Sequence, residues 1–260
     1  MAARWTLDDP GLANLLPAEG FRNYADFAGC ERGEVVARSG TTVTRRLRME
    51  GPGGGEFYLK QYRYAGPRWR HRFRRSKDAI EARNYALLRD RCGVCVPQVV
   101  AHGSRRAGWR LLDAFILTRG VCGAVPLERW WREQSADAGR AAAALRTIER
   151  WAEVIARMHR AGVFHVDLQW RNLLVRPGAP AAELFVLDSA RGGRRRSPWM
   201  RNHATVRDLS GLEKSARRYL TRTQRLRWLR AYLRARGRSA EHVAPLARTI
   251  ARDRARKDAP

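Results

Sequence analysis

Apolar and polar residues alternate with the two-residue period of β-strands in the early part of the chain. The alternation runs through residues 34–38, 42–47 and 56–62. Small turn-forming residues at 39–41 and 51–55 separate these segments, which is typical of strands joined by tight turns. The pattern therefore predicts an antiparallel meander. Residues before it include Pro10, Gly11, Pro17 and Gly20, which predict loops and short helices.

A helical pattern and two further strands follow the meander. Apolar residues near helical spacing predict a helix over residues 76–91, and Gly93 is a suitable residue to end it. Apolar runs at 96–101 and 111–118 predict two more strands. The expected order is three strands, one helix and two strands.

The second half of the chain has mainly the 3.6-residue period of helices. Helices are predicted over 127–134 and 138–161, and the second has an apolar stripe formed by Ala142, Leu145, Ile148, Ala152, Ile155 and Met158. Short strands are predicted at 173–175 and 184–187, and basic helices fill residues 205–256.

Composition and charge limit the possible function classes. Apolar residues make up 44% of the 260-residue chain, which is enough for a packed core and excludes a wholly disordered protein. The formal net charge of +27 predicts a polyanionic partner such as nucleic acid, anionic lipid or a phosphorylated glycan. An arginine-rich codon usage is a competing explanation for part of this charge.

No apolar run approaches the roughly 18 residues that a membrane-spanning helix requires, and the N-terminus lacks the apolar region of a signal peptide. We therefore expect a cytoplasmic protein, with peripheral membrane contact as a further option. Cys92 and Cys95 form a lone C-x-x-C pair without the further ligands that zinc needs, so we expect structural thiols.

Residues 162–175 carry the strongest chemical signal. They read H-x-D-L-x-x-x-N followed by a short apolar strand. Kinase-fold phosphotransferases use this spacing to place a carboxylate and an amide on one tight loop. In this assignment Asp167 is the catalytic carboxylate that addresses the acceptor hydroxyl, and Asn172 binds magnesium. His165, the other member of this catalytic set, is expected to shape the loop by hydrogen bonding rather than to act as a base.

The other parts of a phosphoryl-transfer site occur in the order that a kinase fold requires. Asp188 follows a strand and is the expected second magnesium ligand, because magnesium prefers hard oxygen ligands. Lys60, one of four lysines in the chain, lies in the third predicted strand, where a compact cation can hold the nucleotide phosphates. Glu81 in the next helix is the preferred ion-pair partner of Lys60, and Asp78 is the competing one.

Two glycine-containing turns compete for the role of covering the phosphates. A kinase fold has its nucleotide loop between the first and second strands, which favours Ser39, Gly40 and Thr41. The richer Gly51–Gly55 turn lies between the second and third strands and lacks the G-x-x-x-x-G-K-[ST] pattern, so we interpret it as a flexible hairpin.

These elements predict an α+β, protein-kinase-like fold with two lobes. The N-terminal lobe, residues 1–118, has an antiparallel sheet and one helix, and the C-terminal lobe, residues 119–260, is mainly helical. Within that fold the sequence resembles the bacterial lipopolysaccharide core kinases, which phosphorylate Kdo or heptose, over about residues 33–237. The resemblance lies in the catalytic loop and in residues 58–64, 81–88, 96–103, 115–118, 185–188 and 225–233.

The resemblance implies ATP-dependent transfer, with Mg²⁺, to a sugar hydroxyl of the lipopolysaccharide inner core at the cytoplasmic face of the inner membrane. Carried over by residue, Lys60 contacts the nucleotide phosphates and Glu81 pairs with Lys60. Beside these, the expected nucleotide contacts are Ser39, Gly40, Thr41 and Thr118. Asp167 is catalytic, and Asn172 and Asp188 hold the metal. Ser189 and Ala190 follow Asp188 where protein kinases have Phe-Gly, and no A-P-E follows, which disfavours a protein acceptor.

Two arginine-rich segments with aromatic residues, 68–75 and 191–201, flank the predicted site in the sequence. They suit an anionic glycolipid or an anionic membrane surface. A solvated arginine-rich face and nucleic-acid binding, with the aromatic residues as stacking groups, are the alternatives.

Two rival functions stay open at this point. One is a protein kinase or an aminoglycoside-type phosphotransferase on the same fold. The other is a non-catalytic kinase-like module that binds nucleic acid or anionic membrane. The intact set of four expected site residues argues against this module: Lys60, Asp167, Asn172 and Asp188.

Overall fold

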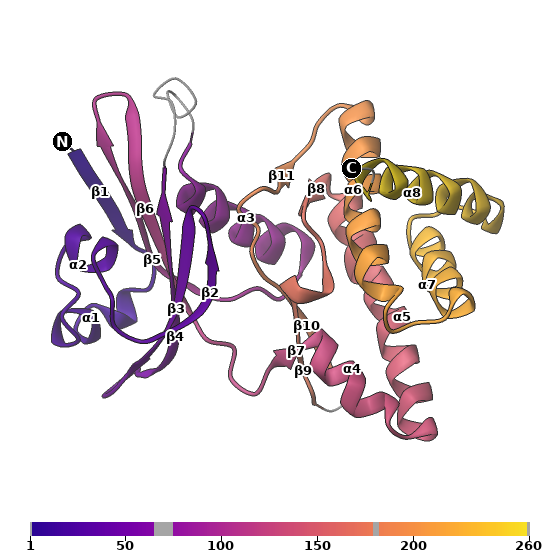
Figure 1. The fold of residues 1–260 in the computed structure, drawn as a ribbon, viewed down its shortest axis with the longest axis horizontal. Coiled ribbons are helices and arrows are strands. Elements are labelled where there is room, and N and C mark those ends of the chain that lie inside the picture. Colours follow the sequence, from indigo (N-terminus) through magenta and orange to yellow (C-terminus); the bar gives the residue numbers. More distant parts are fainter. Residues whose placement is uncertain (1, 65–74, 179–181, 259–260) are drawn as a thin grey trace. The chain divides into compact units, whose positions relative to one another are not determined.

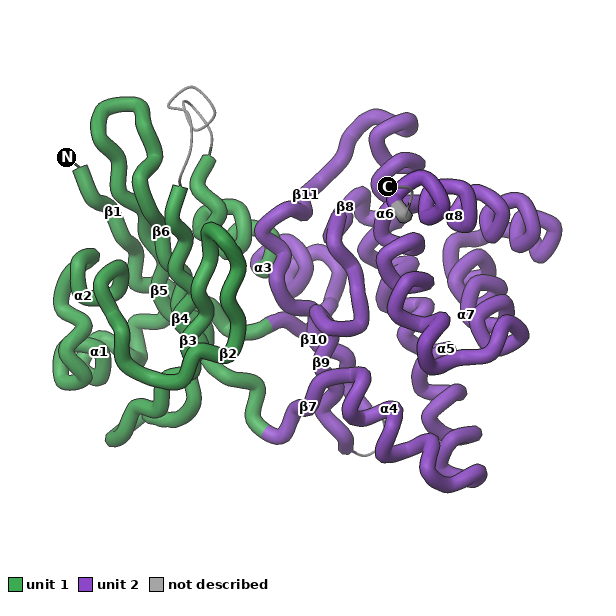
Figure 2. Tube along the Cα trace, viewed as in Figure 1, with its two compact units in different colours: residues 1–85, 97–122 green, residues 86–96, 123–260 purple. Residues whose placement is uncertain are grey.

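The computed structural model describes residues 2–64, 75–178 and 182–258 (Figure 1). The chain divides into two compact units, residues 1–85 with 97–122 and residues 86–96 with 123–260 (Figure 2). The sequence-based boundary after residue 118 stays a prediction. Helix α3 (Lys77–Cys92) begins in the first unit, and its last residues belong to the second.

The first unit contains a six-stranded antiparallel sheet in the order β1-β5-β6-β4-β3-β2. The five predicted strands are confirmed, and a sixth lies at the edge. Their bounds are β1 Ala2–Leu7, β2 Glu34–Ser39, β3 Thr42–Met49, β4 Gly55–Arg63, β5 Val99–Ala107 and β6 Arg110–Arg119. A two-residue loop, Gly40–Thr41, joins β2 to β3, because Ser39 and Thr42 are paired.

One face of this sheet carries the core of the unit. Alternate residues of β4 and β6 point to this face and are completely buried: Phe57, Leu59, Phe115 and Leu117. They pack with the short helices η1 (Pro10–Leu12), α1 (Leu15–Ala18) and α2 (Tyr24–Ala28). Gln61 also points to this face, and its side-chain amide donates to the carbonyls of Phe27, Ala28 and Cys30 at the end of α2.

The opposite face of the sheet meets the first half of α3. Lys60 is paired with Thr44 on β3 and Ile116 on β6, so these three side chains share that face. At the other end of α3, Gly93 has a φ of 57°, and its N–H and that of Val94 donate to carbonyls of the last helical turns. The prediction that Gly93 ends this helix is confirmed.

The prediction of only loops and short helices before residue 33 is wrong for β1. Residues 2–7 pair in antiparallel register with β5, from Ala2 opposite Arg106 to Leu7 opposite Ala101. The close approach of β1 to β5 requires a glycine at position 103, because a Cβ there would lie 2.6 Å from the Arg4 carbonyl oxygen. The strand was missed because its side chains are mostly exposed and lack an alternating apolar pattern.

The second unit is mainly helical. Its helices are α4 (Leu127–Ser135), α5 (Ala138–Arg160), α6 (Pro198–Ala216), α7 (Arg222–Ala235), η4 (Ala240–His242) and α8 (Val243–Asp258). The predicted stripe of α5 is buried from Ile148 onward, whereas Ala142 is exposed. Asp137, Ser197 and Thr221 cap α5, α6 and α7 with side-chain oxygens.

Two small sheets accompany these helices. One has the order β10-β9-β7, with β7 Val125–Pro126, β9 Leu173–Arg176 and β10 Glu183–Val186. The other pairs β8 (Val163–Phe164) with β11 (Gly193–Arg194). The α+β fold class predicted from the sequence is confirmed. Among the described residues, no helix is both long and apolar enough to cross a membrane.

Candidate active site

The predicted catalytic loop lies in the second unit between β8 and the 3-10 helix η3 (Trp170–Asn172). Val166 within it has a φ of 70°, a left-handed conformation that β-branched residues avoid. Such a conformation costs about 1–3 kcal/mol and persists where the surroundings hold it. The loop therefore depends on groups outside it.

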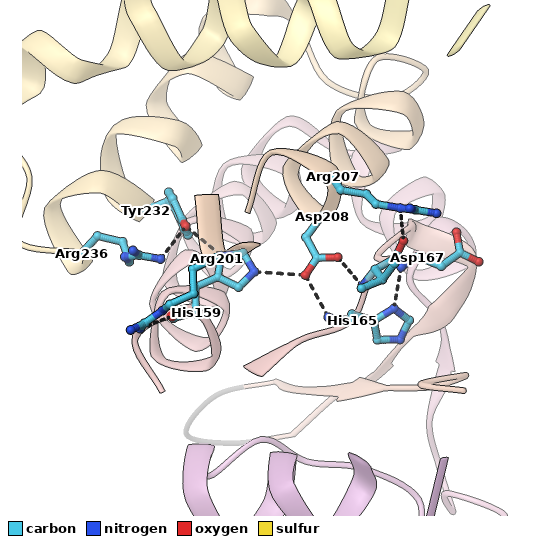
Figure 3. A network of polar contacts seen from close by, with 9 residues as sticks. His159, His165, Asp167, Arg201, Arg207, Asp208, Tyr232 and Arg236 are labelled. Atoms are coloured by element: carbon cyan, nitrogen blue, oxygen red, sulfur yellow. Dashed lines mark hydrogen bonds and ion pairs between the residues drawn. The ribbon is translucent and has the colours of Figure 1, made fainter. Parts of the chain in front are cut away.

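Asp208 of α6 provides the main support. Its carboxylate is completely buried and accepts hydrogen bonds from the backbone N–H of Val166, at 2.6 Å, and of His165, at 2.9 Å. The neighbouring Arg207 donates its Nε to the Val166 carbonyl at 3.1 Å. Two consecutive residues of α6 thus hold both peptide groups of the strained residue (Figure 3).

A buried chain of hydrogen bonds continues from Asp208 to helices α5 and α7. His159 Nε2 lies 3.2 Å from Asp208, and His159 Nδ1 lies 2.7 Å from the Tyr232 hydroxyl. Arg236 donates to the same hydroxyl at 3.2 Å (Figure 3). Burial raises the pKa of Tyr232 to about 12, so this hydroxyl keeps its proton and donates it to His159. With Nδ1 accepting from Tyr232, His159 can donate from Nε2 to Asp208.

Both ring nitrogens of His165 are engaged by the backbone. Nε2 lies 2.6 Å from the Leu187 carbonyl oxygen, to which it must donate, and Nδ1 accepts from the Asp167 N–H at 3.3 Å. This arrangement leaves neither nitrogen for the chemistry of an acceptor. It supports the loop-shaping role expected for His165.

The side chains of Asp167 and Asn172 have different environments. Asp167 keeps 22% of its side chain exposed, with Gln169 Nε2 at 2.6 Å and Arg171 Nη2 at 3.0 Å from its two oxygens. Asn172 is buried, and its amide nitrogen donates to the Asp167 backbone carbonyl at 2.8 Å. The amide oxygen of Asn172 is not used in that bond and suits a cation.

Asp188 lies two residues beyond β10 and has a φ of 55°. The residue before it is tied to the catalytic loop twice. Leu187 donates its N–H to the Asn172 carbonyl at 2.8 Å, and its own carbonyl accepts from His165. These hydrogen bonds therefore fix the position of the Asp188 backbone relative to the loop that contains Asp167.

In the first unit, Lys60 and Glu81 are neighbours. Lys60 Nζ lies 3.3 Å from Glu81 Oε2, and Glu81 is almost fully buried. Tyr62 and Tyr85 also donate their hydroxyls to the Glu81 carboxylate. Three donors around this buried carboxylate satisfy its oxygens and leave it little freedom to move.

The competing partner, Asp78, faces a different residue. Its Oδ2 lies 3.2 Å from His102 Nδ1 on β5, and this hydrogen bond raises the pKa of His102 despite the opposing effect of burial. Asp78 therefore pairs with His102, whereas Glu81 pairs with Lys60.

The remaining residues assigned to the nucleotide lie on the same sheet. Ser39 ends β2, and Gly40 and Thr41 form the turn. Thr118 is paired with Tyr58, two residues from Lys60 on β4, and so shares the face of Lys60. The Gly51–Gly55 turn is instead held by a hydrogen bond from Gly54 to Gly51 and by Arg119, which donates to the Gly53 carbonyl.

The structure describes the second arginine-rich segment, residues 191–201, but little of the first. Residues 68–74 lie outside the described residues. In the second segment Arg201 donates to the carbonyls of His159 and Arg160 at the end of α5, so its role is structural. Trp199 and Met200 are exposed by 75% and 43%.

The cysteines are free, and burial raises the pKa of the Cys92 and Cys95 thiols.

An apolar cavity of about 680 Å³ lies among α5, α6, α7 and α8 of the second unit. Its walls include Ile148, Trp151, Leu212 and Leu229. Five arginines line it as well: Arg217, Arg222, Arg225, Arg248 and Arg254. This cavity was not predicted from the sequence, because it forms only when several helices pack together.

Sequence reasoning also missed Asp208, His159 and Arg207. A signal for Asp208 was present, because it stands in the buried stripe of α6 with Ala204 and Leu212, one turn away on either side. An acidic residue on an apolar helix face requires a partner. The identity of that partner was not readable from the pattern.

Residues 39–232 match the model of the lipopolysaccharide kinase (Kdo/WaaP) family. The chain belongs to this family. Its members are kinases, so the prediction that the protein is a kinase is confirmed.

This lipopolysaccharide kinase is similar to the solved structure "WaaP in complex with acyl carrier protein", with a TM-score of 0.69. The two sequences are 24% identical, and the match covers 98% of this chain and 100% of the chain in that structure. This likeness confirms the kinase-like fold. Among curated proteins, no relative matches the sequence.

The Lys60–Glu81 pair gives a prediction that separates the two candidate partners. In Glu81→Gln the carboxylate charge that faces Lys60 is lost, and we expect kcat/KM for phosphoryl transfer to fall at least about tenfold, or about 1.4 kcal/mol. Asp78→Asn, the matched control, should change kcat/KM less than about threefold. Thermal unfolding of both variants checks that they are folded. A larger loss of activity in Asp78→Asn would contradict the assignment.

Proposed function

We propose that the protein transfers the γ-phosphoryl group of ATP to a sugar hydroxyl, on Kdo or heptose, of the lipopolysaccharide inner core. The family membership supports the lipopolysaccharide acceptor. The observation that carries the catalytic assignment is that Asp208 accepts hydrogen bonds from the strained loop, in which the Asp167 carboxylate is partly exposed.

The residues present fit a magnesium ion and a nucleotide. Magnesium is usually bound by one or two protein oxygens, with phosphates and water completing its shell. The Asn172 amide oxygen and the Asp188 carboxylate are suitable donors, and the backbone between their segments is hydrogen-bonded. ATP would supply the phosphoryl group, and the ion would neutralise charge on its phosphates. Lys60, oriented by Glu81, would contact those phosphates.

Asp167 would accept a hydrogen bond from the acceptor hydroxyl and orient its oxygen toward the phosphorus. As the new O–P bond forms and the bond to the leaving nucleotide oxygen breaks, the hydroxyl proton passes to Asp167. Arg171 and Gln169 would restrain the carboxylate during this step. The loose transition state requires orientation of the acceptor oxygen more than a strong base.

Labelled ATP and purified lipopolysaccharide core test this function. Asp167→Asn is expected to lower transfer at least about 100-fold, because it removes the proton acceptor and leaves the side-chain volume unchanged. Asp90→Asn, at an exposed position of α3, is the matched control and should retain activity. Mass spectrometry of the product identifies the modified sugar.

Other outcomes would favour the rival functions. Absence of ATP turnover, or full activity in Asp167→Asn, would remove the kinase assignment for this site. Preferential labelling of a generic protein or of an aminoglycoside would contradict the proposed acceptor.

We further propose peripheral contact with an anionic membrane through the start of α6. Trp199 and Met200 are exposed apolar residues, and Arg191, Arg194 and Arg196 beside them in the sequence are exposed as well. Tryptophan favours the interfacial region of a bilayer, and each nearby cation contributes about 1 kcal/mol at an anionic surface.

Vesicle sedimentation tests this surface. Trp199→Ala with Met200→Ala is expected to weaken binding to phosphatidylglycerol-containing vesicles at least about fivefold, since apolar contact area is lost. Val35→Ala with Val36→Ala is the control, because these residues are exposed by 40% and 43% on β2. Equal binding of both double variants would contradict the proposal, and tight, salt-sensitive binding to RNA instead would favour the nucleic-acid alternative.

The apolar cavity suggests a second partner. Its volume of about 680 Å³ is typical of ligand pockets, which range over about 300–1,000 Å³. The similar solved structure contains an acyl carrier protein. We propose that the cavity receives the acyl chain of such a carrier, with the lining arginines near its anionic groups.

Binding of purified acyl carrier protein tests this partner. We expect a carrier loaded with a long acyl chain to bind, and Ala251→Trp, which fills part of the cavity, to weaken binding at least about tenfold. Ala244→Trp, on the same helix but outside the cavity, is the control. Equal affinity for carriers with and without the acyl chain would rule out the cavity as the binding site.

A further inference from the structure

A small basic pocket lies beside the proposed catalytic carboxylate in the second unit. It has a volume of about 160 Å³ and is lined by Val166, Asp167, Gln169, Arg207, Ser210, Gly211, Lys214, Arg254 and Lys257. The loop of Asp167 forms one side, and helices α6 and α8 form the others. We call this the basic pocket.

Helix geometry explains why its cations converge. Arg207, Ser210, Gly211 and Lys214 are spaced three, four and seven residues apart and share one face of α6. Arg254 and Lys257 are one turn apart on α8, which packs against α6. Gly211 lets the catalytic loop approach this face, because a Cβ there would lie 2.5 Å from the Leu168 carbonyl oxygen.

The positive charge in the basic pocket exceeds the negative charge around it. Among the described residues Lys214 has no ion pair, and Arg207 donates to a neutral carbonyl. Lys257 pairs with Asp253, and Arg254 lies near Glu213, which also pairs with Arg225 at 3.1 Å. Asp167 itself is paired with Arg171. A concave site lined by cations attracts a complementary anion.

The composition of the basic pocket distinguishes it from the arginine-rich surface. The chain has four lysines, and two of them, Lys214 and Lys257, line this pocket. Lysine provides a compact charge on a flexible stem, which suits a single carboxylate or phosphate group. The Ser210 hydroxyl adds a buried donor, which lies near Asp253 but makes no hydrogen bond of good geometry in the described structure.

We infer that the basic pocket binds a carboxylate or phosphate group carried by the sugar acceptor, beside the hydroxyl that receives the phosphoryl group. Lys214 and Lys257 are then specificity-determining residues, and the bound anion orients the acceptor hydroxyl toward Asp167. The volume is large enough for one such group. This inference rests on the proposed function and identifies which part of the acceptor this site recognises.

Acceptor discrimination tests the inference. The kcat/KM is measured for a sugar acid with a carboxylate, a phosphorylated heptose and an unsubstituted heptose. In Lys214→Gln with Lys257→Gln, we expect the preference for the anionic acceptors over the neutral one to fall at least about tenfold. A fall for one anionic acceptor alone identifies the natural anion as carboxylate or phosphate.

Arg218→Gln with Arg252→Gln is the charge-matched control, since both arginines are exposed and outside the pocket. Its preference should equal that of the wild type. An unchanged preference in the lysine variant would overturn the inference. So would a raised KM for ATP with unchanged acceptor preference, because the cations would then serve the nucleotide.

A binding measurement separates this inference from the proposed function. Titration of the protein with the sugar acid, without ATP, is expected to give heat in the wild type and in the arginine control but at least about tenfold weaker binding in the lysine variant. If no sugar is phosphorylated, the proposed function fails and the titration still decides the pocket. Equal binding by all three proteins would overturn the inference, and thermal unfolding checks that each is folded.

Discussion

The buried carboxylate of Asp208 is the constraint on which the helical unit and its catalytic loop depend. An unpaired charge at a completely buried position would cost about 3–5 kcal/mol, so α6 can bury this face only if donors are present. The donors come from two other parts of the chain, the loop at 165–166 and His159 of α5. Each part therefore stabilises the others, and the strained Val166 conformation is held at the point where the three meet.

Backbone contacts carry this support from Asp208 to the groups proposed for chemistry. His165 joins the loop to Leu187, the residue before Asp188, and Asn172 joins it to both Asp167 and Leu187. These contacts join side-chain or main-chain nitrogens to main-chain carbonyls, so the Asn172 amide oxygen is not used in them and suits a cation. Asp208, His159 and Tyr232 all lie within the region that matches the family, whereas α8 lies beyond it. The support belongs to the matched region, and half of the basic pocket's cations are added by a segment outside it.

The sequence predicted those features that depend on local spacing. The meander and α3 could be predicted because turn residues and apolar periodicity repeat over a few positions, and the spacing of residues 165–172 predicted the loop proposed for catalysis. It did not predict β1, whose pairing with β5 spans about a hundred residues and whose side chains are mostly exposed. The sequence shows that Asp208 needs a partner only after the apolar stripe of α6, on which Asp208 lies, has been recognised. The basic pocket could not be predicted from the sequence, because Lys214 and Lys257 come together only when α6 packs against α8.

The net charge of +27 also has a physical explanation beyond a single polyanionic partner. Many arginines here donate to backbone carbonyls, including Arg119 to Gly53, Arg201 to His159 and Arg207 to Val166. A neutral carbonyl satisfies the guanidinium hydrogen bond but does not cancel its charge, so the structural use of arginine leaves a positive field around the molecule. This positive field attracts anions in general over long range. Recognition at short range needs charges at defined positions, and this is the role that we propose for the lysines of the basic pocket beside Asp167.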